Sequence, residues 1–261
     1  MAHRYILAEN EEGTATIVLN RPEVRNALHL EALAEFRNAL EKADSDPEVR
    51  VILITGAGEK AFCAGRDLKE YSKYAAKPIE DWAFRMSGKV ITFNFPEQVQ
   101  KPTIAAINGF ALAGGCELAL SCDMRIASET SVFGFSEIDL GVFPGAGAAW
   151  QLPRVVGKSQ ALRMILTGDL INAEEALRIG LVDQVVRPER LMLEARALAG
   201  KIAKKNAWAV RLTKTVIHHS AEAHIDTARV VSNALRSLAE TLTDAEERVA
   251  GLKSTPKKPG Q

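Results

Sequence analysis

Residues 104–119 read IAAINGFALAGGCELA, and the fold of the chain can be worked out from this stretch. The apolar, partly β-branched run Thr103–Ile107 predicts a strand that ends at Asn108-Gly109. The Gly114-Gly115 step then predicts the start of a helix, where the first backbone N–H groups are unpaired and sterically open. Such donors can hold a developing oxyanion, and the helix dipole adds a positive field at that end.

A single carboxylate, that of Glu117, lies in the first turn of this expected helix. Its neighbours are apolar, so the side chain must reach a cleft, a partner or water, because burying it unpaired costs several kcal/mol or raises its pKa. Acidic residues also favour the first turn of a helix, so spacing alone leaves a capping and a catalytic role equally open. Glu137 follows twenty residues later, and alone it would be read as a surface or capping residue.

The flanking sequence predicts an α/β body. Strands are expected over Thr14–Leu19, residues 50–55 and residues 124–127, and apolar residues at helical spacing separate the first two. After Pro144 the patterns are mostly helical. They cover residues 158–167, 172–179, 188–204, 207–220 and 223–242. We therefore expect an α/β body to about residue 150, followed by a helical C-terminal region.

Composition narrows the function classes. The chain has 261 residues, of which 47% are hydrophobic and 25% charged, and its formal net charge is zero, so we expect no nucleic-acid or membrane partner. MAHRYILAEN at the N-terminus has no apolar signal region, and Asn108 and Glu117 interrupt the apolar run 103–122, which argues against a lone bilayer helix. The odd set Cys63, Cys116 and Cys122 fits a reducing compartment, so we expect a cytoplasmic protein.

Three segments together are far more specific than any residue alone: AFCAGRDLK (61–69), the 104–119 stretch and FGFSEIDLGVFPG (133–145). They resemble the enoyl-CoA hydratase/isomerase (crotonase) superfamily, and the resemblance runs from Leu19-Asn20-Arg21-Pro22 to Gly180-Leu181-Val182. It implies a crotonase-like (ClpP/crotonase) α/β fold, a spiral of ββα units. The core is expected over residues 1–195, and a helical C-terminal oligomerisation region over residues 196–261.

The resemblance assigns roles to particular residues. It implies an oxyanion hole made by the backbone N–H groups of Arg66 and Gly114, which would polarise a thioester carbonyl and stabilise an enolate. Hydratases of the family carry glutamates at the positions of Glu117 and Glu137, whereas isomerases and other branches commonly keep one or neither. Two carboxylates can bracket one water, directing it to the β-carbon and delivering a proton to the α-carbon. We therefore expect a hydratase that converts an enoyl-CoA to a 3-hydroxyacyl-CoA in fatty-acid or related acyl-CoA breakdown.

Coenzyme A is expected as part of the substrate, with no separate cofactor and no metal. The resemblance implies a set of contacts to it: Val24, Arg25, Asn26, Ala64, Arg66, Asp67, Leu68, Lys69 and Gly114. Arg25, Lys69, Lys257 or Lys258 could meet its phosphates, and each could equally be a solvated surface cation. His218, His219 and His224 lie far along the chain from the motifs, which favours a surface or interface role over metal binding.

The chain departs from the family pattern near the acyl group. Arg66 replaces a small residue, so its guanidinium would lie beside the ligand or point to solvent. Residues 148–151 read AAWQ where the family usually has GTQR, which brings Trp150 close to the active-site loop unless it belongs to the core. Trp82, Phe84 and Trp150 are therefore the acyl-pocket candidates, within or near segments that vary among relatives.

Other functions are compatible with the same sequence. One is a double-bond isomerase, or a hydratase for a branched, cyclic or aromatic acyl-CoA. Another is a non-catalytic member of the fold that binds RNA or coenzyme A, against which the neutral charge and the intact glutamate pair argue. The resemblance also implies a homotrimer, often paired into a hexamer, with the C-terminal helices at the interface.

Overall fold

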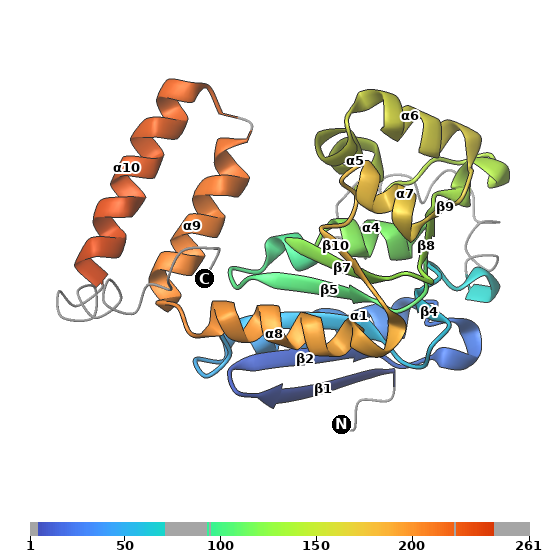
Figure 1. The fold of residues 1–261 in the computed structure, drawn as a ribbon, viewed down its shortest axis with the longest axis horizontal. Coiled ribbons are helices and arrows are strands. Elements are labelled where there is room, and N and C mark those ends of the chain that lie inside the picture. Colours follow the sequence, from blue (N-terminus) through green and yellow to red (C-terminus); the bar gives the residue numbers. More distant parts are fainter. Residues whose placement is uncertain (1–4, 71–92, 94, 222, 243–261) are drawn as a thin grey trace, which may run out of the picture.

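The computed structural model describes residues 5–70, 93, 95–221 and 223–242, and its strands form two sheets (Figure 1). The larger sheet has the strand order β1-β2-β3-β5-β7-β10, and the smaller one has the order β4-β6-β8-β9. The strands are β1 (Ile6–Glu11), β2 (Thr14–Leu19), β3 (Val51–Gly56), β4 (Ala61–Cys63), β5 (Thr103–Ile107), β6 (Phe110–Leu112), β7 (Met124–Ser128), β8 (Val132–Gly134), β9 (Ile171–Asn172) and β10 (Gln184–Val186).

The helices of the described residues are interspersed with the strands up to β10, and only helices follow in the C-terminal part. They are α1 (Leu30–Ser45), α4 (Gly114–Leu120), α5 (Ala148–Val156), α6 (Lys158–Thr167), α7 (Ala173–Arg178), α8 (Leu191–Ala203), α9 (Ala207–Ser220) and α10 (Ile225–Leu242). Short 3₁₀ helices add η1 (Pro22–Val24), η3 (Phe95–Gln98), η4 (Ser136–Leu140) and η5 (Pro188–Arg190). None of the helices within the described ranges combines the length and the apolar character needed to cross a bilayer.

Strand β3 shows how the larger sheet is covered on both faces. It pairs in parallel with β2 and β5, and all six of its residues are buried. Alternate side chains enter different clusters: Ile52 and Ile54 pack on the side of α1, whereas Val51 and Leu53 pack on the side of α8. A strand buried on both faces needs a continuous apolar run, which is why this segment was recognisable in the sequence.

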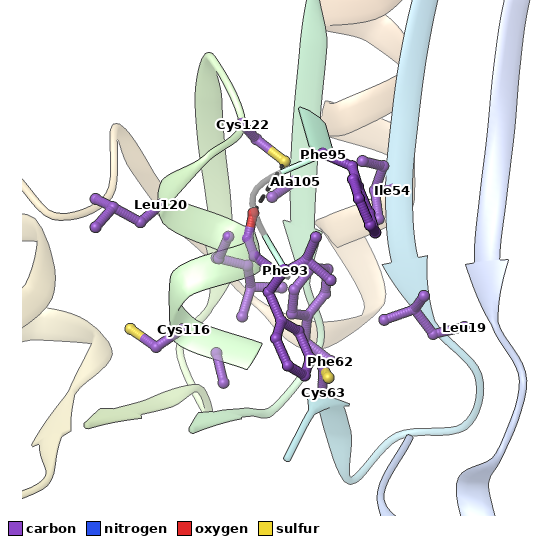
Figure 2. Packing of buried hydrophobic residues seen from close by; sticks show 14 of the residues in the cluster. Leu19, Ile54, Phe62, Cys63, Phe93, Phe95, Ala105, Cys116, Leu120 and Cys122 are labelled. Atoms are coloured by element: carbon purple, nitrogen blue, oxygen red, sulfur yellow. Dashed lines mark hydrogen bonds between the residues drawn. The ribbon is translucent and has the colours of Figure 1, made fainter. Parts of the chain in front are cut away.

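The α1-side cluster extends from the larger sheet to the smaller one. Figure 2 shows part of this cluster, including Ile54 of β3, Phe62 of β4, Phe93 and Phe95. Phe36 of α1 stacks obliquely on Phe95, with ring centroids 6.4 Å apart. This shared core fixes the smaller sheet, which carries the candidate site, against the larger one.

Several sequence-based expectations are confirmed. Strands occur over Thr14–Leu19 and Thr103–Ile107, and a helix begins at Gly114. The apolar run 103–122 is thus divided among β5, β6 and α4. The expected end of the α/β body near residue 150 is wrong, because β9 follows α6 and β10 joins the edge of the larger sheet beside β7.

The C-terminal helices differ in how they attach. Ala195 and Ala199 of α8 are buried on the larger sheet, and the expected domain boundary between residues 195 and 196 lies within this helix. The division of the chain into two domains stays a prediction. Helices α9 and α10 pack against each other and extend away from the sheets (Figure 1). Asp123 anchors α9 to the body, because its carboxylate pairs with Lys214 at 2.8 Å and with His218 at 2.7 Å.

Candidate active site

The candidate site lies where parallel strands of the smaller sheet end. Strands β4, β6 and β8 run in parallel, so their carboxyl ends lie at one edge. Chain segments leave that edge toward Arg66, into α4 with Glu117, and into η4 with Glu137. Parallel pairing therefore brings together three groups that are far apart along the chain.

Close backbone contact joins the first two of these segments. Gly65 has a φ of +89°, and a Cβ there would lie 2.9 Å from the Leu112 carbonyl oxygen and 3.0 Å from the Gly114 nitrogen. A Cβ on Gly115 would lie only 1.9 Å from the carbonyl oxygen of Cys63. The start of α4 thus packs directly on the β4 backbone, and only glycine permits this approach.

The start of α4 is held in a strained conformation. Ala113 has φ 50° and ψ −127°, a combination that costs on the order of 1–3 kcal/mol in a residue with a side chain. Its N–H donates to Gly134 of β8 at 2.9 Å, and its carbonyl accepts from Cys116 and Glu117. Because Gly114 is the first helical residue, its own N–H has no acceptor among the described residues and is available to a ligand.

Arg66 occupies the neighbouring position on an extended segment. A parallel bridge joins it to Leu28, in which Leu28 donates to Gly65 at 2.8 Å and accepts from Asp67 at 3.1 Å. Backbone groups alternate along an extended chain, so the Arg66 N–H faces the opposite edge from Leu28. The convergence of this N–H and that of Gly114 on one thioester oxygen stays a prediction.

Glu117 is buried, with only 2% of its surface exposed, and its carboxylate has defined partners. Oε1 accepts hydrogen bonds from the backbone N–H groups of Ala146 at 2.8 Å and Ala148 at 3.1 Å, at the start of α5. Burial raises the pKa of Glu117 to about 7, the nearby charge of Glu137 adds to the rise, and the two hydrogen bonds oppose it. Near neutral pH both protonation states are therefore accessible, as acid–base catalysis requires.

Glu137 is half-buried in η4, and its carboxylate has fewer hydrogen-bond partners among the described residues than that of Glu117. The Oε2 atom of Glu137 is buried and has no hydrogen-bond partner within the described part of the chain, and burial raises the pKa of the carboxyl group. A buried carboxylate oxygen without a partner is costly, and in native proteins it calls for a specific explanation. Such an oxygen beside a second carboxyl group is suited to binding a water or a substrate proton.

The expected coenzyme A contacts have different roles in the structure. Asn26 is fully buried, and both amide protons are used, since Nδ2 donates to the carbonyls of Ala57 and Ala61. Its side chain thus stabilises the loop rather than presenting a donor. Arg25, in contrast, is exposed and lies over the Phe110 ring, 5.3 Å from its centroid.

The remaining expected contacts differ in their burial and pairing. Asp67 pairs with Arg21 at 3.0 Å; burial alone would raise its pKa, but the hydrogen bonds from Arg21 and from the backbone hold that pKa below its usual range. Leu68 and Lys69 are exposed, whereas Val24 and Ala64 are half-buried. Lys257 and Lys258 lie outside the described residues.

The acyl-pocket candidates are only partly described. Trp82 and Phe84 lie outside the described residues, and Trp150 lies on α5 with 44% of its surface exposed, so it is not a core residue. Phe93 belongs to the same variable segment of the sequence as Trp82 and Phe84, and a Cβ on Gly114 would lie 2.6 Å from its ring. The ring therefore packs directly against Gly114, whose N–H has no acceptor among the described residues.

The backbone partners of Glu117 were also not predicted. Ala146 and Ala148 act through main-chain N–H groups, and the only trace of this in the sequence is the glycine-rich run 145–147 between Pro144 and α5. Side-chain identity at these positions does not report a backbone donor, so no pattern search would have found them.

Comparison with known proteins agrees with this geometry. The family profile described as "Enoyl-CoA hydratase/isomerase" matches residues 9–256. Crotonyl-CoA hydratase of Syntrophomonas wolfei is 43% identical over 87% of this chain and 86% of its own, and short-chain-enoyl-CoA hydratase of Clostridium acetobutylicum is 43% identical over 85% and 84%. The crystal structure of enoyl-CoA hydratase from Bacillus anthracis superposes with a TM-score of 0.88 at 38% identity, covering 99% of this chain and 100% of the other.

The chain belongs to the enoyl-CoA hydratase/isomerase, or crotonase, family, and its two sheets with C-terminal helices form the crotonase fold. The resemblance found in the sequence is thereby confirmed. A substrate that is an acyl-CoA thioester follows from membership of the family. The individual residue roles at the site remain proposals.

The raised pKa of Glu117 predicts a specific pH dependence of stability. Between the ordinary value of 4.5 and about 7, the folded protein binds more protons at this carboxyl than the unfolded chain, so its stability falls as the pH rises through that window. Replacing Glu117 with Gln keeps an oxygen acceptor for Ala146 and Ala148 but removes the buried charge. We expect Glu117→Gln to be more stable than the wild type by about 3 kcal/mol at pH 8, and by far less at pH 5.

Urea unfolding of both proteins at the two pH values measures this difference. Glu189→Gln, at an exposed carboxylate of η5, is the matched control and should follow the wild type at both pH values. Parallel stability curves for wild type and Glu117→Gln would show that the carboxyl group of Glu117 titrates normally in the folded protein.

Proposed function

We propose that this protein is an enoyl-CoA hydratase that adds water across the 2,3 double bond of an enoyl-CoA to give a 3-hydroxyacyl-CoA. The observation that carries the proposal is the pair of shielded carboxyl groups, buried Glu117 and half-buried Glu137, beside Gly114, whose N–H has no acceptor among the described residues. An isomerase needs a single group to shuttle one proton, whereas hydration requires a base for water and an acid for the α-carbon. Retention of both glutamates therefore favours hydration.

The reaction can be written with this chain's own groups. The thioester oxygen accepts hydrogen bonds from the N–H groups of Arg66 and Gly114, and the positive end of α4 stabilises its developing negative charge. Water held between Glu117 and Glu137 gives one proton to one carboxylate as its oxygen bonds to the β-carbon. The other carboxyl group gives a proton to the α-carbon. The atoms of one water are thus added, and one proton transfer between the two groups through solvent restores the starting state.

The acyl group is proposed to be short and unbranched. The two relatives at 43% identity are named for crotonyl-CoA and for short-chain enoyl-CoA. Phe93 packed against Gly114 is consistent with a confined space beside the reacting carbons. These observations favour a short substrate over the branched, cyclic or aromatic alternatives, and we propose that the enzyme acts in acyl-CoA degradation.

A homotrimer or hexamer is proposed on the basis of the C-terminal helices. Ile217 of α9 and Ile225 and Val230 of α10 are 65%, 71% and 68% exposed, and large apolar side chains this exposed on one helix pair favour burial against another chain. Light scattering should give a mass of three or six chains, and Val230→Glu should lower it. A wild-type mass of a single chain would contradict the proposal.

Mutation of the two glutamates tests the catalytic proposal. We expect Glu117→Gln and Glu137→Gln each to lower kcat by roughly 10²–10⁴-fold, because each removes an acid–base group. The assay follows the loss of the enoyl-thioester absorbance with crotonyl-CoA, and Glu189→Gln serves as the control that retains wild-type kcat. Strong loss with only one of the two variants would indicate an isomerase, and an inactive wild type that still binds coenzyme A would indicate a binding protein.

A further inference from the structure

The loop that holds Glu117 is itself braced by Gln151, one turn into α5. Its backbone N–H donates to the carbonyl of Gly147 at 2.8 Å, and Gly147 lies between the two residues that donate to Glu117. The Gln151 side chain also lies against this glycine, because a Cβ on Gly147 would be 3.1 Å from the Gln151 Oε1 atom. Gln151 therefore contacts the loop through both its backbone and its side chain.

The far end of the same side chain reaches a different segment. Nε2 of Gln151 donates a hydrogen bond to Oε2 of Glu97 in η3. Two residues before η3 begins, Phe93 packs against Gly114, where the thioester oxygen is proposed to bind. Gln151 thus connects the loop that orients Glu117 with the segment that covers the start of α4.

The Gln151 amide is not explained by its contribution to the fold alone. Its Oε1 atom is buried and has no hydrogen-bond partner within the described residues, so an apolar side chain of similar size would fill the same space without this orphaned oxygen and would lose only the bond to Glu97. The Gln151 amide has one buried oxygen without a partner in the described part of the chain and one nitrogen that donates to a carboxylate. This arrangement indicates that the bond to Glu97 has a function at the active site.

We propose that Gln151 is a positioning residue of the hydratase, which through its bond to Glu97 holds the 146–148 loop and thereby fixes the carboxylate of Glu117 against the substrate. This proposal rests on the proposed function. Gln151 touches no reacting atom; its effect is transmitted by the N–H groups of Ala146 and Ala148. Catalysis depends on such placement, since a shift of about 1 Å can cost roughly 10²-fold in rate.

Turnover of crotonyl-CoA by four variants tests the proposal. Gln151→Leu should lower kcat by about 10- to 100-fold while KM stays within about twofold, because binding is retained and orientation is lost. Gln151→Glu should be at least as impaired, because it places two carboxylates together. Exchanging the pair, Glu97→Gln with Gln151→Glu, should restore most of the wild-type kcat, a rescue that a merely structural role would not give.

The fourth variant is a matched control. Gln160 lies on α6, and its Oε1 atom is likewise buried without a partner in the described part of the chain. Gln160→Leu is the same substitution in a similar environment away from the loop, and it should retain wild-type kcat.

Hydrogen exchange of the backbone gives a readout that does not depend on turnover. In Gln151→Leu the amides of Ala146 and Ala148 should exchange about tenfold faster than in the wild type, and in the exchanged pair they should be protected again. An unchanged exchange rate, a wild-type kcat or a change confined to KM would each overturn the positioning role. If the wild type does not hydrate crotonyl-CoA, the hydratase function fails, and exchange alone decides whether Gln151 holds the loop.

Discussion

The bond from two backbone N–H groups to the buried carboxylate of Glu117 is the interaction on which the rest of the site depends. Without it, the charge on Glu117 would be buried with no compensation, and the group would stay protonated at neutral pH. With it, the pKa comes to about 7, between the value of a fully desolvated acid and that of a surface one. The start of α5 therefore sets the pKa of Glu117 through its backbone N–H groups, a role that its alanine- and glycine-rich sequence does not indicate.

A second constraint is that the backbone segments of the site must approach one another closely. Gly65, Gly114 and Gly115 lie where a Cβ would collide with the backbone of a neighbouring strand or with the Phe93 ring. Strain at Ala113 adds to the cost, as do the side-chain oxygens of Glu137 and Gln151 that have no partner in the described part of the chain. These features lower the stability of the fold and are concentrated at the candidate site. Such a concentration is expected where catalysis requires a strained geometry.

Much of this arrangement could be predicted from the sequence. Long apolar runs identified β2, β3 and β5, because strands buried in a covered sheet need continuous hydrophobicity, and family resemblance identified both glutamates. Strands β4, β6 and β8 have three residues each, too few to show a period. β1 was missed because five of its six residues are exposed at the sheet edge, and α5 was hidden by Pro153 within it. The donors to Glu117 could not be predicted, since every residue type except proline offers the same backbone N–H, and the glycine-rich run 145–147 does not show which group that N–H faces.

The central claim is that two carboxyl groups add one water across a conjugated thioester. Incubating the enzyme with crotonyl-CoA in ¹⁸O-labelled heavy water, followed by mass spectrometry and NMR of the product, tests it most directly. The account predicts ¹⁸O on the β-carbon and a single deuterium on one face of the α-carbon. A product that carries deuterium on the γ-carbon, with the double bond moved and no ¹⁸O, would contradict it.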